Sequence, residues 1–180
     1  MNIILIGFAS SGKTTTAKAL AKLLNYPHLD LDEQIELMHE KKEGKSLKVR
    51  QLFSNCGKEG FTKLEHEALK AIAGAENTII STGGHAPLCA NNQMLLKKLG
   101  KIIYLRADSQ TIIKRMQNKG FPSSIKGGKQ GLLEEIRFRN PVYRAISDII
   151  IESDTLSPEQ TAQEIIRICN LESQTKSIRR

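Results

Sequence analysis

The sequence predicts a three-layer α/β/α fold in which helices cover both faces of a five-stranded parallel sheet. Short apolar runs of strand length alternate with segments of helical period, as in parallel strands joined by crossover helices. Three of these runs are continuous and rich in Ile and Leu, as expected for strands that are buried on both faces. The expected strands are Asn2–Ile6, His28–Leu31, Thr78–Ser81, Lys101–Leu105 and Asp148–Ile151.

The helices between these strands are predicted from apolar residues that recur three and four positions apart. Two such sets follow the first and the fourth expected strand, namely Ala17, Leu20, Ala21 and Leu24, and Ile112, Ile113 and Met116. Near the end of the chain, Ser157, Pro158 and Gln160 combine an N-cap serine with a proline at the first helical position and a glutamine at the third. This combination predicts that a helix begins there.

The 180 residues are enough for one domain with one core, and we expect that domain to span residues 1–171. Residues 119–131 hold four glycines and a proline, so we expect a mobile lid there. The basic tail, residues 172–180, is expected to fray.

Composition excludes several classes of protein. The chain is 39% hydrophobic but contains no apolar run of the roughly 20 residues that a membrane span needs. The start of the chain lacks the basic region of a signal peptide, so we expect a cytoplasmic protein. Its three cysteines form no C-x-x-C pair, which argues against a zinc site or a disulfide framework.

The net charge of +8 comes from basic residues that are scattered along the chain, and aromatic residues are only 4%. Nucleic-acid binding is therefore not expected, because it needs clustered cations or stacking platforms. The excess charge suits a small anionic ligand. We expect a monomer.

The segment Gly7–Thr14 matches the phosphate-binding motif G-x-x-x-x-G-K-[ST] and lies between an expected buried strand and an expected helix. Backbone N–H groups and the helix N-terminus would surround the phosphates of ATP, and Lys13 would reach the β- and γ-phosphates. The Thr14 hydroxyl would bind Mg²⁺. The residues expected to bind the nucleotide are Ser10, Ser11, Gly12, Lys13, Thr14 and Thr15.

Two further motifs follow the second and third expected strands. Asp30 and Asp32 lie two residues apart, so their carboxylates would point the same way from an extended chain. One carboxylate would hold the metal and the other would accept a proton from a substrate hydroxyl. Asp32 alone would also fit a helix N-cap. Gly83 and Gly84 would offer backbone N–H groups at the same edge of the sheet, although a plain strand-to-helix turn explains these glycines about as well. For His85 we identify no partner and favour a structural or solvent-exposed role.

The order of these motifs resembles that of shikimate kinases, small P-loop enzymes that phosphorylate a ring hydroxyl of shikimate with ATP. The resemblance covers the chain from Asn2 to about Cys169 and includes the segments Gly57–Glu65 and Arg139–Tyr143. It implies that Asp32 binds shikimate and acts as the base, and that Asp30 and Thr14 hold Mg²⁺. It also implies that the substrate-binding residues are Asp32, Phe61, Gly83, Gly84 and Arg139, and that the catalytic residues are Lys13 and Asp32.

The chain departs from the family pattern at three positions. Thr62 and His85 stand where the family has an arginine and a third glycine, and Phe121 stands where its lid has an arginine before a proline. Lys63 is a poor substitute for the first arginine, since neighbouring helical residues point about 100° apart.

These departures leave alternatives open. One is a kinase for another polyol or sugar acid such as gluconate, and another is a nucleotide-binding protein without catalytic activity. A nucleoside monophosphate kinase is disfavoured, because residues 119–131 contain no arginine.

Overall fold

The computed structural model describes residues 1–117, 125 and 127–171. Five parallel strands form one sheet in the order β2-β3-β1-β4-β5. The strands are β1 (Asn2–Ile6), β2 (His28–Asp30), β3 (Ile79–Ser81), β4 (Gly100–Arg106) and β5 (Ile149–Glu152). Each lies within two residues of its predicted bounds, and the predicted α/β fold class with five parallel strands is confirmed.

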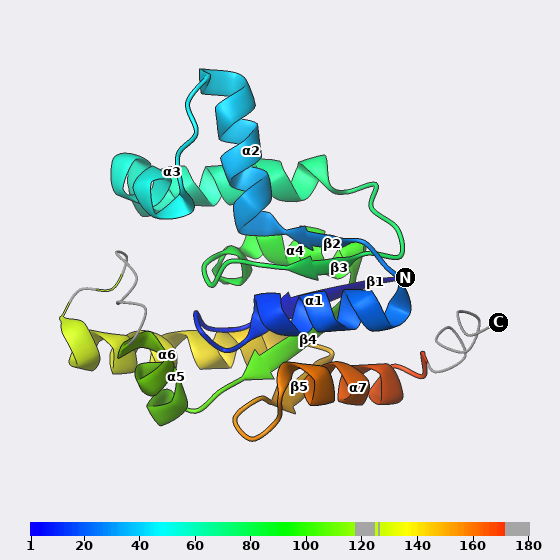
Figure 1. The fold of residues 1–180 in the computed structure, drawn as a ribbon. Helices are drawn as coiled ribbons and strands as arrows, with labels where there is room; N and C mark the ends of the chain where they lie inside the picture. Colours follow the sequence, from blue (N-terminus) through cyan, green and yellow to red (C-terminus); the bar gives the residue numbers. More distant parts are fainter. Residues whose placement is uncertain (118–124, 126, 172–180) are drawn as a thin grey trace.

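Helices α1 (Lys13–Leu24) and α7 (Pro158–Ile168) cover one face of the sheet (Figure 1). Ile3 and Leu5 of β1 point to that face and pack with Leu20 of α1 and Ile165 of α7, all of them fully buried. The start of α7 is confirmed, because Ser157 and Gln160 form a reciprocal capping box.

The remaining helices pack on the opposite face, to which Ile4 and Ile6 point. These helices are α2 (Leu31–Glu43), α3 (Val49–Ala71), α4 (Ala90–Leu99), α5 (Ser109–Gln117) and α6 (Gly128–Ile146), together with the short 3₁₀ helix η1 (Ala86–Leu88). The apolar alternation along β1 thus divides the core between the two faces.

The predicted lid falls mostly outside the described residues, which omit 118–124 and 126, and so does the predicted frayed tail at 172–180. The expectation that the irregular segment reaches residue 131 is wrong, because α6 already begins at Gly128. No helix among the described residues is both long and apolar enough to cross a membrane.

The strands run parallel, so their carboxyl ends meet at one edge of the sheet. The P-loop follows β1, the two aspartates lie at the end of β2, and the glycine pair follows β3. Because β3 lies between β1 and β2, these three segments become neighbours in space.

Candidate active site

The P-loop leaves the N-terminus of α1 without a side-chain cap. Gly12 occupies the N-cap position in the left-handed region at φ 98°, and no acidic residue lies in the first turn of the helix. The Ser11 hydroxyl is buried and has no hydrogen-bond partner among the described residues. Unpaired N–H groups and the positive end of the helix dipole favour an anion here, so the segment fits the phosphates of a nucleotide.

Lys13, the lysine of the motif, is buried, and its ammonium donates to the Phe8 carbonyl at 2.7 Å. Burial lowers the pKa of Lys13 to about 8, although the nearby Asp32 and Asp30 carboxylates oppose that shift. The side chain therefore keeps its positive charge at neutral pH and lies beside the loop that would hold the phosphates.

Asp30 is the N-cap of α2, where its carboxylate accepts a hydrogen bond from the Asp32 backbone N–H at 3.0 Å. It also accepts from the Thr14 hydroxyl at 3.0 Å and from the Ser81 hydroxyl at 2.8 Å. The expectation that the two carboxylates project from one extended segment is therefore wrong, because Asp32 already belongs to α2. The alternative that Asp32 caps the helix is also wrong, because Asp30 is the N-cap. The pairing of Thr14 with Asp30 places two oxygen ligands together, which suits Mg²⁺ completed by phosphate and water.

Asp32 lies in the first turn of α2 and faces the glycine pair. A Cβ added to Gly83 would come within 2.6 Å of the Asp32 Oδ1 atom, so only glycine permits this close approach. Burial, and then the Asp30 carboxylate, raise the pKa of Asp32 to about 6, while Lys13 opposes the shift. Asp32 is therefore ionised above pH 7 and is a stronger base than an ordinary aspartate.

A pocket of about 280 Å³ opens between the P-loop, α2, α3 and α6. It brings all five predicted substrate-binding residues together, since Asp32, Phe61, Gly83, Gly84 and Arg139 line it. Ser10 of the P-loop lines it as well. We call this cavity the acceptor pocket. A molecule bound in it would lie directly beside the loop that would hold the phosphates.

Arg139 is buried, with only 4% of its surface exposed, and several contacts hold its side chain in place. Its guanidinium pairs with Glu135 at 2.7 Å and lies 5.0 Å from the centre of the Phe8 ring. It also donates to His85 Nε2 at 3.1 Å. His85 therefore does have a partner, contrary to expectation, and burial and Arg139 lower its pKa to about 4. The neutral ring accepts from Arg139 through Nε2.

Glu65 is fully buried in the wall of the acceptor pocket. Neither carboxylate oxygen makes a hydrogen bond of good geometry with the described residues. Burial, and then Asp32, raise the pKa of Glu65 to about 8, which Arg139 and the Ala86 backbone N–H offset only in part. Glu65 is thus a neutral acid at pH 7 and can donate a hydrogen bond into the pocket.

Thr62 and Lys63 do not take the place of an arginine in the acceptor pocket. The Thr62 hydroxyl donates to the Lys58 carbonyl at 2.9 Å. Lys63 lines a separate pocket between α2 and α3, as its position on the helix predicts. The third departure from the family pattern, Phe121, lies outside the described residues.

Two arginines that the sequence analysis did not single out lie at this edge of the sheet. Arg50 lines the acceptor pocket. Arg115 of α5 donates to the Ser10 carbonyl and to the Ser153 carbonyl, both at 3.2 Å, and lines a second pocket beside Gly12. No motif marks either residue, because each is an isolated cation on an amphipathic helix.

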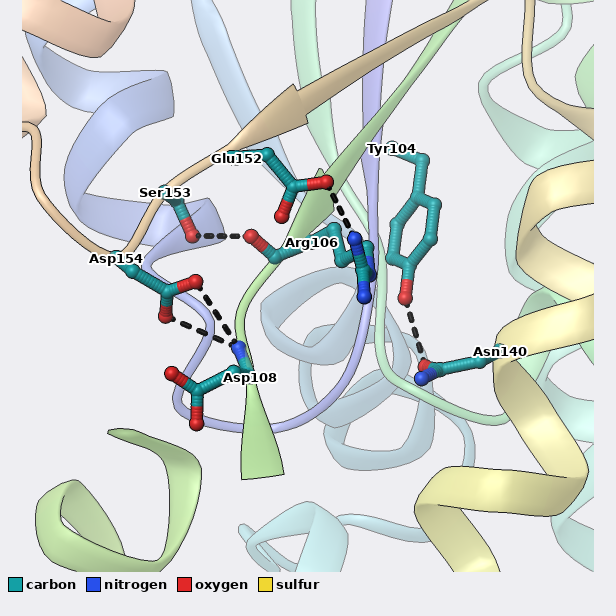
Figure 2. Close-up of polar contacts among 7 residues, drawn as sticks. All are labelled: Tyr104, Arg106, Asp108, Asn140, Glu152, Ser153 and Asp154. Carbon is teal, nitrogen blue, oxygen red and sulfur yellow. Dashed lines mark hydrogen bonds and ion pairs between the residues drawn. The ribbon is translucent and has the colours of Figure 1, made fainter. Parts of the chain in front are cut away.

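Polar contacts join the segments at the ends of β4 and β5 (Figure 2). The Ser153 hydroxyl lies 3.0 Å from the carbonyl oxygens of both Arg106 and Ser11, and its single proton is shared between these two acceptors. Arg106 pairs with Glu152 at 2.6 Å, and Asp154 accepts from the Asp108 backbone N–H at 3.0 Å (Figure 2). The loop after β5 is thereby tied to the P-loop.

Comparison with known proteins agrees with this geometry. The shikimate kinase family matches residues 9–170 of the chain. The chain is 34% identical to a shikimate kinase of Sulfurihydrogenibium sp. over 92% of its own length and 95% of that protein. It is 36% identical to a shikimate kinase of Caldicellulosiruptor saccharolyticus over 93% of its own length and 94% of that protein.

Solved structures of the same family share the fold. The shikimate kinase of Acinetobacter baumannii, in complex with shikimate, has a TM-score of 0.83 at 29% identity and covers 94% of this chain and 93% of its own. The shikimate kinase of Aquifex aeolicus has a TM-score of 0.78 at 29% identity and covers 96% and 98%. The resemblance inferred from the order of the motifs is therefore confirmed, and the chain belongs to the shikimate kinase family of ATP-dependent kinases.

Proposed function

We propose that this protein transfers the γ-phosphoryl group of ATP to a hydroxyl of shikimate, in the cytoplasm and with Mg²⁺ as cofactor. The observation that carries the proposal is the acceptor pocket itself, in which Asp32 and the buried Arg139 lie beside Ser10 of the P-loop. A hydroxy acid bound there would have its carboxylate at an arginine and a hydroxyl next to the phosphate cradle.

Lys13 and the N-terminus of α1 would position the triphosphate. The ammonium that now donates to the Phe8 carbonyl would turn to the β- and γ-phosphates. Thr14 and Asp30 would hold Mg²⁺, which supplies charge neutralisation on the phosphates when it is bound with ATP. The remaining P-loop residues Ser10, Ser11, Gly12 and Thr15 would surround the phosphates.

Asp32 would accept the proton of the acceptor hydroxyl as its oxygen bonds to the γ-phosphorus and the bond to the β–γ bridging oxygen breaks, which releases ADP. The raised pKa of Asp32, about 6, matches this task at neutral pH. Arg139 would bind the carboxylate of shikimate as a charge-assisted pair. Phe61 would pack against the ring, and Gly83 and Gly84 would donate backbone N–H groups to its hydroxyls.

A coupled assay of ADP release, with shikimate, gluconate and nucleoside monophosphates as separate acceptors, tests the proposal. We expect saturable ADP release with shikimate and a background rate with the other acceptors. If gluconate or a nucleotide were phosphorylated and shikimate gave no rate above background, shikimate would be ruled out as the acceptor. The control is the Lys13→Ala variant, which should show the background rate with every acceptor.

A further inference from the structure

The acceptor pocket combines two carboxyl groups with one buried cation that already has a partner. Asp32 and Glu65 line the pocket, and the guanidinium of Arg139 pairs with Glu135 at 2.7 Å. An acidic acceptor would add a further negative charge to this site. Arg139 would then have to compensate the acceptor carboxylate while it retains Glu135, so a second cation at the pocket would strengthen binding considerably.

Arg50 stands at the rim of that pocket. It is the second residue of α3, and Val49, Arg50 and Phe53 line the pocket together. Phe53 lies four positions after Val49 and three after Arg50, so its side chain lies between theirs on one side of the helix. Arg50 as a residue is exposed to solvent and lines the pocket, which places it at the mouth of the pocket.

The backbone that carries Arg50 is fixed from two sides. Glu36 of α2 accepts from the Val49 backbone N–H at 3.0 Å and pairs with Lys48 at 2.7 Å. Three residues after Arg50, the Phe53 ring packs against Phe61 and His85, with ring centres 5.5 and 5.4 Å apart. The start of α3 is thereby held against the acceptor pocket, and the order of its backbone limits the entropy that Arg50 would lose on binding.

Two other cationic side chains near the acceptor pocket do not line it. Lys13 donates to the P-loop at Phe8, and Lys63 lines the separate pocket between α2 and α3. Among the residues that the structure describes, Arg50 and Arg139 are the two cationic side chains that line the acceptor pocket. They lie on different elements, α3 and α6, as a clamp on one carboxylate requires.

We infer that Arg50 is a specificity-determining residue that binds the carboxylate of the acceptor together with Arg139. The inference rests on the proposed function, since it concerns the acceptor of that reaction. The planar guanidinium of Arg50 closes over the carboxylate at the pocket mouth, while Arg139 holds it from the buried side. The pair selects acidic acceptors over neutral polyols of the same size.

The test compares steady-state kinetics of the wild type with those of Arg50→Ala and Arg50→Lys. We expect Arg50→Ala to raise the KM for shikimate roughly 10–100-fold, the range of a charge-assisted hydrogen bond. The KM for ATP and the kcat should change less than about threefold, because Arg50 contacts neither the phosphates nor the reacting hydroxyl. Arg50→Lys should recover part of the loss through charge alone. Lys63→Ala, which removes an exposed cation from the same helix, is the matched control and should leave all three constants unchanged.

The methyl ester of shikimate separates a contact with the carboxylate from a general effect on the pocket. If Arg50 binds the carboxylate, Arg50→Ala should raise the KM for the ester less than about twofold. An equal rise for shikimate and its ester, or an unchanged KM for shikimate in Arg50→Ala, would overturn the role of Arg50 while the kinase activity stood. No phosphorylation of shikimate by the wild type would instead overturn the proposed function.

Discussion

Lys13 carries the positive charge that lies nearest the phosphate cradle, and it contributes little to the packing of the core. Replacing it with Ala removes one hydrogen bond, to the Phe8 carbonyl, which should cost about 1 kcal/mol. We therefore expect Lys13→Ala to reduce kcat/KM by at least ~1000-fold and to lower the unfolding midpoint by only about 2–4 °C. Calorimetry and initial rates check both parts. Near wild-type turnover with any acceptor would contradict the role of Lys13.

Glu65 makes the stability of the protein depend on pH. Its pKa is raised from 4.5 to about 8 in the folded chain, so between these values the unfolded chain binds fewer protons than the folded one. The contribution of Glu65 is therefore fully present below pH 4.5 and is lost as the pH rises through 8. Relative to Glu65→Gln, which cannot ionise, the wild type should lose on the order of 2–4 kcal/mol between pH 5 and pH 8.

Urea unfolding of both proteins at pH 5 and pH 8 measures this difference directly. Glu67→Gln is the matched control, because it makes the same substitution at an exposed glutamate of the same helix. A wild type that keeps the same stability relative to Glu65→Gln at both pH values would show that Glu65 is ionised in the folded protein.

Single residues were predictable where a motif fixes both their type and their neighbours. Lys13 and Thr14 lie at the start of α1, directly after the glycine-rich turn, as their place in the motif predicts. The pairing of His85 with Arg139, at 3.1 Å, was not predictable, since the two residues are 54 positions apart. The raised pKa of Glu65 was not predictable either, because it results mainly from burial, which is a property of the packed structure.

At the scale of elements, the kink in α3 shapes the acceptor pocket. Gly57 interrupts the helix at φ 66° and ψ −173°, a conformation that is almost exclusive to glycine. The kink lets both halves of α3 reach the pocket, through Arg50 and Phe53 before it and through Phe61 and Glu65 after it. The helical period alone does not reveal this change of direction.

Replacing Gly57 with Ala should therefore affect both stability and binding of the acceptor. We expect a loss of about 1–3 kcal/mol in the free energy of unfolding and a rise in the KM for shikimate that exceeds any rise in the KM for ATP. Chemical denaturation and initial rates provide the two measurements. Gly74→Ala is the control, because a Cβ at Gly74 meets no atom within 4 Å and its φ is not in the left-handed region. Equal effects of the two substitutions would contradict a special role for the kink.

The elements themselves were largely predictable, because buried parallel strands are short apolar runs and amphipathic helices are periodic. The exception is the start of α2, which begins directly after β2 with Asp30 as its cap. The sequence pattern instead extended the strand to Leu31 and left Asp32 as a candidate for the cap. Local periodicity cannot resolve such a boundary when one aspartate serves both elements.

At the scale of the whole molecule, the order of the strands brings the site together. Sequence periodicity indicates five parallel strands, but it does not tell that β3 lies between β1 and β2. That arrangement places the P-loop, the two aspartates and the glycine pair at one edge of the sheet. The order of the motifs along the chain allowed the family to be recognised, whereas the second arginine at the pocket emerged only from the three-dimensional fold.

The proposed function requires that the phosphoryl group of ATP pass to shikimate in the acceptor pocket, with Asp32 as the base. The most direct measurement determines kcat and KM for shikimate, with the equilibrium affinity for ATP in parallel, in the wild type and in Asp32→Asn. Asparagine has nearly the same shape as aspartate but cannot accept the hydroxyl proton. We expect turnover to fall by ~100-fold or more while ATP affinity changes less than about threefold, since Asp32 lines the pocket that we propose for the acceptor. Undiminished turnover of shikimate, or a collapse of ATP binding with acceptor binding intact, would contradict the account.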